Sequence, residues 1–136
     1  MKYVVLMSHG HLASGMKSTV ELIAGANERL KAFDAYVDGH GDIHSFLGEF
    51  LEKHKEDEVI AVTDILGGSV NNDALTYNQR QQLYIVAGMN VPLVLNLVLK
   101  LDSDMDTVEM IRESIQESQE LLTYCEKTQA EEDEEF

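Results

Sequence analysis

The sequence contains few residues that crosslink a chain and no long hydrophobic run. It has one cysteine, one proline and no tryptophan. With Cys125 alone, no internal disulfide can form, and this cysteine usage fits a reducing compartment. The apolar run near the N-terminus ends at Met7, which makes it too short for a signal peptide or a membrane-spanning helix. From these absences we expect a cytoplasmic protein.

Basic residues are also scarce, with 10 lysines and arginines against 25 aspartates and glutamates, so the net charge is −15. A surface this acidic repels phosphate backbones and anionic lipid headgroups, which excludes nucleic acids and membranes as partners. Residues 102–136 hold 13 acidic and two basic side chains, a net −11, whereas residues 1–101 carry −4. The acidic run at 131–135 predicts a solvated end, so we assign a domain to residues 1–126 and a flexible acidic tail to residues 127–136.

Short apolar runs alternate with segments of helical periodicity along the first 101 residues. Apolar runs predict strands at residues 3–7, 59–63 and 83–87, and an alternating pattern predicts another strand at residues 30–37. Each predicted strand is followed by a predicted helix, and in the first two helices the apolar residues recur every three or four positions. In the first of these helices they are Leu12, Met16, Val20 and Ile23. We therefore predict a single α/β domain in which a mostly parallel central sheet is flanked by helices.

Polar residues and the one proline predict where helices begin. Asp42 and Ser69 are suited to accept the free N–H groups of a first helical turn, and Pro92 suits the first turn of another helix. A last helix is expected from Asp106. Residues 121–125 either continue this helix or form a short final strand.

Three loops lie where a sheet of this kind binds ligands. In parallel α/β sheets, ligands occupy the crevice beyond the carboxyl ends of the strands, at the switch in strand order. The segments at that position are residues 8–11, 64–69 and 88–90. The first two contain His9 and Asp64, which we take as the candidate catalytic residues.

His9 and Asp64 have the chemistry of a phosphoryl acceptor and its partner. The positive end of a helix close behind His9 disfavours a charged ring, and neutral imidazole is a good nucleophile. A carboxylate at Asp64 would bind one ring nitrogen, fix the tautomer and present the other nitrogen for attack. Groups suited to phosphoryl oxygens are expected from Gly10, Gly67, Gly68 and Ser69. Together these residues describe in-line phosphoryl transfer to a histidine without a metal.

The other histidines point to no metal site. His40 and His44 are four residues apart, a spacing compatible with zinc, but no cysteine or third ligand accompanies them. We therefore expect them to be surface residues. His11, in the first turn of a predicted helix, is expected to line the crevice beside His9.

Three blocks of the sequence resemble the enzyme IIA component of the mannose-type sugar phosphotransferase system (the mannose, fructose, sorbose and gluconate group). The blocks are residues 5–10, 62–69 and 86–92. They come in the order found in the family, and the resemblance covers residues 2–124. Its specific parts are the aspartate-x-x-glycine-glycine-serine block that begins at Asp64 and the glycine-x-asparagine-x-proline block that begins at Gly88.

The resemblance implies an activity, partners and an assembly. The family's histidine takes a phosphoryl group from the phosphocarrier HPr and passes it to the enzyme IIB component, which phosphorylates sugar arriving through a membrane complex of IIC and IID. By this resemblance, the protein is a phosphotransferase with a phosphohistidine intermediate at His9, Asp64 holds the ring, and no cofactor is needed. The family also forms homodimers in which a C-terminal strand, here residues 121–125, pairs with the other subunit.

The sequence departs from the family's pattern directly after the second block, which ends at Ser69. Members often carry proline and phenylalanine after the serine, whereas Val70 and Asn71 follow Ser69 here. We expect this change to alter the rim of the site, and with it the preference for a partner, more than the chemistry.

Other catalytic classes fit the sequence less well. A serine hydrolase would use Ser8 or Ser69 with His9 as base, but the glycine-x-serine-x-glycine pattern is absent. A histidine phosphatase or mutase usually has an arginine beside its histidine, where Ser8 stands here. A nucleotide-binding switch would need a glycine-lysine-serine stretch that the chain lacks.

The nearest alternative is the phosphotransfer subunit of a dihydroxyacetone kinase, which shares the fold and the histidine. The blocks at Asp64 and Gly88 favour the sugar-transport role. A purely structural dimerisation protein would leave His9 and Asp64 unexplained. The sequence does not specify which sugar is transported, because that choice resides in the membrane components.

Overall fold

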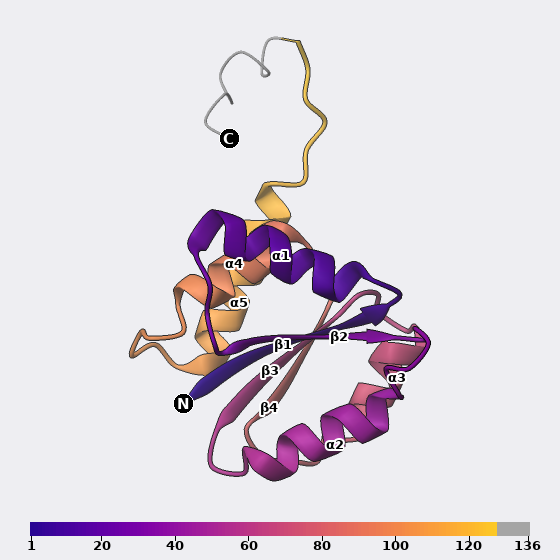
Figure 1. The fold of residues 1–136 in the computed structure, drawn as a ribbon. Helices are drawn as coiled ribbons and strands as arrows, with labels where there is room; N and C mark the ends of the chain where they lie inside the picture. Colours follow the sequence, from indigo (N-terminus) through magenta and orange to yellow (C-terminus); the bar gives the residue numbers. More distant parts are fainter. Residues whose placement is uncertain (128–136) are drawn as a thin grey trace.

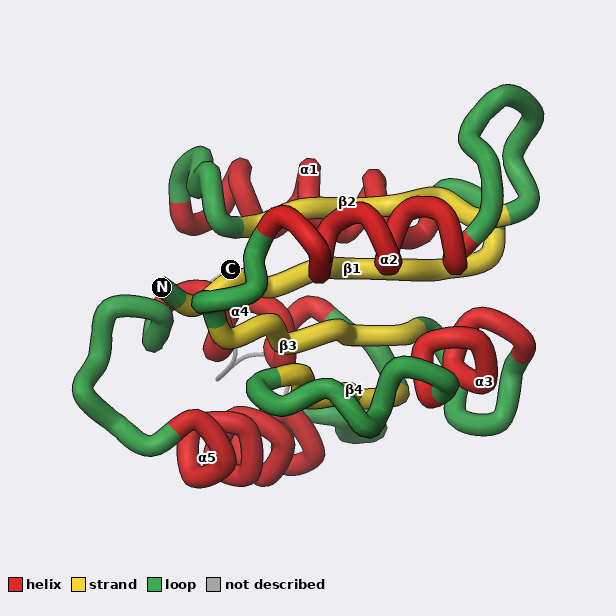
Figure 2. The backbone as a smooth tube through the Cα atoms, turned by 90° about the horizontal axis from the view of Figure 1, so that it is seen from below, coloured by secondary structure: helices red, strands yellow, loops and turns green. Residues whose placement is uncertain are grey.

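The computed structural model describes residues 1–127 and contains one sheet of four strands. The strands are β1 (Lys2–His9), β2 (Leu30–Ala35), β3 (Glu58–Thr63) and β4 (Leu83–Ala87). Their order across the sheet is β2-β1-β3-β4, which Figure 2 shows from top to bottom, and all neighbouring pairs are parallel. The predicted α/β domain with a parallel sheet is confirmed.

Five helices connect and cover these strands within residues 1–127. They are α1 (Leu12–Ala24), α2 (Ile43–Lys53), α3 (Ser69–Leu75), α4 (Val91–Leu99) and α5 (Thr107–Glu120). Helices α1, α4 and α5 lie on one face of the sheet, and α2 and α3 lie on the other (Figure 1). None of these helices is long and apolar enough to cross a membrane.

The sheet is buried on both faces, which explains the uninterrupted apolar runs in the sequence. In β1, Val4 and Leu6 belong to the core formed with α1, α4 and α5, whereas Val5 and Met7 belong to the core formed with α2 and α3. All four side chains are fully buried. A strand that is covered on both sides does not alternate between apolar and polar residues.

The order of the strands predicts a ligand site between β1 and β3. From β1 the chain passes through α1 to β2 on one side, and then returns to β3 and β4 on the other side of β1. The connections therefore change direction between β1 and β3, which is where parallel sheets bind ligands at their carboxyl ends. Because Met7 pairs with Thr63, His9 and Asp64 come just after the paired ends of adjacent strands.

The helix starts are only partly as predicted. Asp42 caps α2, and its side chain accepts the Ser45 N–H at 2.7 Å. Asn90 caps α4 in the same way. The cap predicted at Ser69 is wrong, because the N-cap of α3 is Gly68 and Ser69 is the first helical residue. The hydroxyl of Ser69 is therefore available to groups outside the helix.

The segment after α5 leaves the body of the domain. Residues 122–126 form neither helix nor strand, and the chain runs away from the sheet (Figure 1). Three large side chains on this segment are exposed, namely Leu121, Leu122 and Tyr124. The exchange of residues 121–125 between two subunits stays a prediction, and nearly all of the assigned acidic tail lies outside the described residues.

Candidate active site

His9 and Asp64 meet at the carboxyl end of the sheet as predicted. The Nδ1 atom of His9 lies 2.7 Å from Oδ2 of Asp64, and the backbone N–H of His9 donates to the same oxygen at 2.8 Å. The other carboxylate oxygen accepts the Ile65 N–H at 3.0 Å. The His9 side chain is 46% exposed, whereas that of Asp64 is 10% exposed. The carboxylate is thus held from three directions and in turn holds an accessible ring.

The protonation state of Asp64 determines which ring nitrogen of His9 carries the free lone pair. Partial burial raises the pKa of Asp64, but the hydrogen bonds from the His9 backbone and ring, together with the His9 charge and the Ile65 N–H, lower it further. The net pKa lies below the usual value of 3.8. The carboxylate is therefore ionised at neutral pH and accepts a proton from Nδ1, which leaves the lone pair on Nε2.

A serine and a tyrosine complete the surroundings of Nε2. The Oγ atom of Ser69 lies 3.1 Å from Nε2, and the Tyr36 hydroxyl donates to this Oγ at 2.7 Å. The Tyr36 ring also lies against the His9 ring, with 5.2 Å between centroids and an interplanar angle of 41°. Ser69 was predicted, but Tyr36 was missed, because a tyrosine in an apolar run has the pattern of an ordinary strand residue.

The glycines shape the loops and differ in what they offer a ligand. Gly10 has a φ of 56° and its N–H donates to the Ala35 carbonyl oxygen at 2.9 Å, so this N–H does not face the crevice. The Gly68 N–H is similarly used by the Ile65 carbonyl oxygen at 3.2 Å. A Cβ on Gly68 would come 2.7 Å from the Ile65 side chain and 3.5 Å from Cε1 of His9, so only glycine fits without a shift.

Phosphate contacts from this loop would therefore come from other backbone groups. Gly67 supplies the turn with a φ of 80°. The N–H groups of Ser69 and Val70, in the first turn of α3, have no acceptor within residues 1–127. These two groups are free donors at the start of α3, whose first residue, Ser69, contacts the ring of His9.

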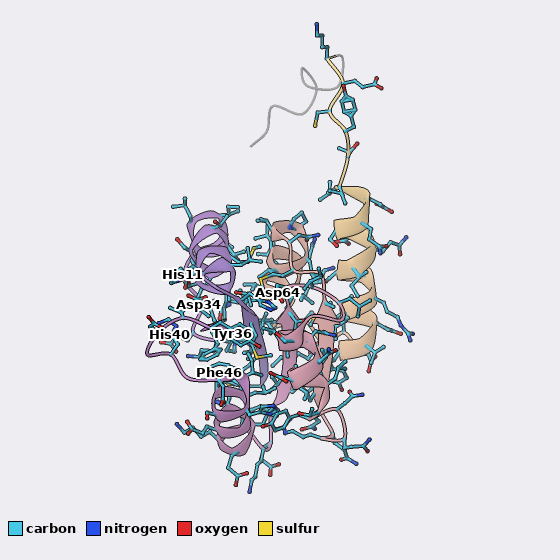
Figure 3. All side chains as sticks on the ribbon, turned by 90° about the vertical axis from the view of Figure 1, so that its right-hand side faces the viewer. His11, Asp34, Tyr36, His40, Phe46 and Asp64 are labelled. Carbon is cyan, nitrogen blue, oxygen red and sulfur yellow. The ribbon has the colours of Figure 1, made fainter. Side chains whose placement is uncertain are left out.

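A second histidine–carboxylate pair lies next to the first. His11 Nδ1 is 3.0 Å from Oδ2 of Asp34, whose carboxylate also accepts the Ser14 N–H at 2.9 Å and the Ser14 hydroxyl at 2.6 Å. His40 Nδ1 donates to the Asp34 carbonyl oxygen at 3.2 Å. Figure 3 labels this group, with Tyr36 and Asp64 to its right. Asp34, at only 5% exposure, is another residue that the sequence did not single out.

The pKa of Asp34 is lowered in the folded state. Burial raises it, but the two hydrogen bonds from Ser14 and the interaction with His11 more than offset this effect. Asp34 is therefore a buried carboxylate that fixes the orientation of the exposed His11 ring.

The two histidines that the sequence places four residues apart do not form a common site. His44, on α2, contacts the ring of Tyr77 and lies 3.6 Å from Asp73, whereas His40 faces Asp34. In the part of the chain that the structure describes, no group of three histidine, cysteine or acidic side chains could hold a metal ion. Asn90 serves as the cap of α4, so its side chain is used by the helix.

The departure at Val70 and Asn71 does not form the rim of the site, so that expectation is wrong. Val70 is fully buried and Asn71 is 2% exposed. Oδ1 of Asn71 accepts a hydrogen bond from the Thr63 hydroxyl at 2.7 Å, which ties α3 to the end of β3. The two residues therefore support the loop from beneath, next to the end of β3, which Asp64 follows.

The geometry suits a group that is accepted on Nε2 and later given up. The His9 ring is exposed and fixed by an ionised carboxylate, and the Ser69 hydroxyl lies 3.1 Å from Nε2, where it could bind an incoming oxygen. No general base is needed, since Nε2 already carries its lone pair. This arrangement fits a carrier of phosphoryl groups better than a hydrolase.

Comparisons with known proteins agree with one another. The EIIA-man family, described as the fructose IIA component of the phosphotransferase system, matches residues 3–116. The sorbose-specific EIIA component from Klebsiella pneumoniae is 30% identical over 101 residues, which cover 72% of this chain and 73% of that protein.

Two solved structures are similar over most of the chain. A protein from Klebsiella pneumoniae, described as a permease of the phosphoenolpyruvate-dependent sugar phosphotransferase system, has a TM-score of 0.85 at 30% identity, over 93% of this chain and 93% of that one. The IIA protein associated with the fucose utilization operon of Streptococcus pneumoniae has a TM-score of 0.68 at 30% identity, over 85% of this chain and 89% of that one. The resemblance predicted from three sequence blocks is thus confirmed across nearly the whole domain. The chain belongs to the mannose-type family of phosphotransferase-system IIA components, which take part in phosphoryl transfer for sugar uptake.

Proposed function

We propose that His9 accepts a phosphoryl group on Nε2 from phosphorylated HPr and passes it to the enzyme IIB component. The observation that carries this proposal is the 2.7 Å contact between His9 Nδ1 and the ionised Asp64, because it leaves the exposed Nε2 as the nucleophile. The protein is then a phosphotransferase with a phosphohistidine intermediate. It acts in the cytoplasm, where HPr and IIB are found, and serves a membrane complex of IIC and IID only indirectly.

The transfer step balances without an added base or metal. The Nε2 lone pair attacks phosphorus, the new P–N bond forms, and the bond from phosphorus to the donor breaks with its electron pair leaving on the donor. The proton on Nδ1 stays in place against Asp64. The positive charge that develops on the ring is balanced by that carboxylate, and the Ser69 hydroxyl is positioned to bind a phosphoryl oxygen. In the second transfer an acceptor group of IIB attacks phosphorus, and the P–N bond breaks with its electron pair returning to Nε2.

The surroundings of His9 form a surface suited to a protein donor. Four large side chains around the site are exposed although they are apolar or aromatic, namely Leu12, Tyr36, Ile65 and Leu66. Exposed apolar side chains that cluster at a site are typical of a protein interface. HPr and IIB would occupy this surface in turn, because each must bring its own phosphoryl site to His9.

We also propose that two subunits pair through the C-terminal segment. Strand β4 is an edge of the sheet, and a groove of about 380 Å³ lies beside it, lined in part by Leu83, Ile85 and Ile111. Residues 122–126 run away from their own domain with Leu122 exposed. A segment of this kind from a second copy would extend the sheet and cover the groove.

A labelling experiment tests the site. The protein is incubated with radiolabelled phosphoenolpyruvate, enzyme I and HPr, and should acquire one acid-labile, base-stable phosphoryl group that a IIB component then removes. His9→Ala should abolish the label. His11→Ala, which removes the other histidine that bonds a buried carboxylate, should keep it. Full labelling of His9→Ala would show that the phosphoryl group is carried elsewhere.

A further inference from the structure

Tyr36 adopts a backbone conformation that bulky residues rarely take. It follows the last residue of β2 and has a φ of 62°, in the left-handed region. Such a value in a tyrosine is uncommon because its Cβ meets the neighbouring carbonyl oxygen. Conformations of this kind persist where the rest of the structure holds them, and they are concentrated at functional sites.

The position of the side chain is not explained by burial. Tyr36 is 63% exposed, so little apolar surface is removed from water. The contacts that it does make are both with the site. Its ring lies 5.2 Å from the ring of His9, and its hydroxyl donates to Oγ of Ser69 at 2.7 Å. The left-handed turn at the end of β2 is what brings both contacts together.

We propose that Tyr36 is a positioning residue for phosphoryl transfer at His9. This inference rests on the proposed function and adds a residue to it. The hydroxyl orients Ser69, and the ring covers one side of the phosphohistidine against water.

The hydrogen bonds define how the hydroxyl acts. Since the Tyr36 O–H donates to Ser69, the Ser69 proton is free to point to the lone pair on His9 Nε2, which lies 3.1 Å from Oγ. When Nε2 bonds to phosphorus, it can no longer accept this hydrogen bond, and the Ser69 hydroxyl donates to a phosphoryl oxygen instead. Tyr36 continues to donate to Ser69 throughout, so the serine keeps one orientation and no proton leaves the site.

The ring has a separate effect on the product. A phosphohistidine is lost when water attacks phosphorus, and an aromatic ring packed beside the imidazole limits the approaches open to water. The hydroxyl therefore governs the rate of transfer, and the ring governs the lifetime of the phosphoprotein. Two variants separate these effects.

Tyr36→Phe removes only the hydroxyl, and Tyr36→Asn removes the ring while tolerating a left-handed backbone. Tyr77→Phe is the matched control, because the Tyr77 hydroxyl donates to the His44 carbonyl oxygen and has no contact with His9. Each variant is labelled with phospho-HPr. The rate of uptake and the half-life of the isolated phosphoprotein are then measured.

We expect Tyr36→Phe to slow uptake by about 2- to 10-fold, the factor typical of one hydrogen bond between neutral groups, with the half-life unchanged. Tyr36→Asn should slow uptake as much and also shorten the half-life by about twofold or more, as water gains access. The ¹⁵N NMR signal of His9 Nε2 should shift in Tyr36→Phe, because its hydrogen bond from Ser69 is no longer oriented. Tyr77→Phe should match the wild type in all three measurements.

The proposal is overturned if Tyr36→Phe labels as fast as the wild type with an unshifted Nε2 signal, or if Tyr77→Phe slows uptake equally. Should Tyr36→Asn fail to fold, the rate and the Nε2 signal of Tyr36→Phe decide the role of the hydroxyl on their own. A wild-type protein that acquires no label at His9 would instead refute the proposed function, whatever the behaviour of Tyr36.

Discussion

Replacing Asp64 by asparagine removes the charge that holds the His9 ring but keeps the shape of the side chain. One carboxylate oxygen accepts both the backbone N–H and the Nδ1–H of His9, and the other accepts the Ile65 N–H. An amide has one oxygen and one NH2 group. The asparagine therefore cannot accept from both His9 and Ile65, and its NH2 group must face the N–H groups of one of them.

The size of the effect follows from these contacts. A hydrogen bond to a charged group contributes about 1.5–3 kcal/mol, against about 0.5–1.5 kcal/mol between neutral groups, so the loss is about 1–2 kcal/mol. Since about 1.4 kcal/mol corresponds to a tenfold change in rate, transfer should slow by about 5- to 30-fold. If the NH2 group faces His9, the ring proton must move to Nε2, and the nucleophilic lone pair is lost.

The assay is rapid-quench measurement of phosphoryl uptake from phospho-HPr, with circular dichroism to confirm the fold. Asp73→Asn is the matched control, because it removes one negative charge from α3, where Asp73 lies near His44 and not near His9. The control separates a change in electrostatic attraction to HPr from a change at the ring. Uptake by Asp64→Asn within about twofold of the control would refute the role assigned to the carboxylate.

Three further outcomes can be measured. Gly10→Ala should lower the free energy of unfolding by about 1–2 kcal/mol, because Gly10 has a φ of 56°. Gly15→Ala, whose new methyl group would lie in open space on α1, should raise the free energy of unfolding by about 0.5–1 kcal/mol. Urea denaturation that changes both values in the same direction would contradict this. Because the pKa of Asp34 is lowered on folding, its stabilising effect is present above about pH 3.8 and is lost as the pH falls through the folded value. The stability of the wild type relative to Asp34→Asn should therefore shrink from pH 5 to pH 3, and a constant difference would exclude this effect. The full chain should sediment as a dimer at micromolar concentration, and a monomer would contradict the exchange of residues 121–125.

The fold could be predicted because the strands are buried on both faces and appear in the sequence as apolar runs. The run at 83–87 matches β4 at both ends, and the run at 59–63 misses only the first residue of β3. The run at 30–37 extends past β2, which stops at Ala35 because Tyr36 turns left-handed. Nothing in a strand-forming tyrosine indicates that turn.

The pair His9 and Asp64 could be predicted from one rule, the meeting of the carboxyl ends of parallel strands. Asp34 lies in β2, and Tyr36 is the residue directly after this strand. Both reach the site only through the register of β1 with β2. A register of this kind depends on packing in three dimensions. It is not specified by spacing along the chain.

Ser69 shows how two local roles compete for one hydroxyl. A serine before a helix is a good cap, yet here the hydroxyl bonds His9 and Tyr36, and Gly68 takes the cap position. The burial of Val70 and Asn71 could not be predicted from the sequence either. In a helix of only seven residues, the buried face cannot be identified from periodicity.

The two edges of the sheet have different consequences for solubility. The outer strand β2 carries Lys31 and Asp34, and charges at an edge discourage pairing with foreign strands. The opposite edge, β4, reads leucine-tyrosine-isoleucine-valine-alanine without a charge. An uncharged edge of this composition is a template for any extended chain, so we expect the segment proposed to pair with it to stay bound. A chain that is cut after Glu120 is therefore expected to aggregate through β4 and not to persist as a stable single subunit.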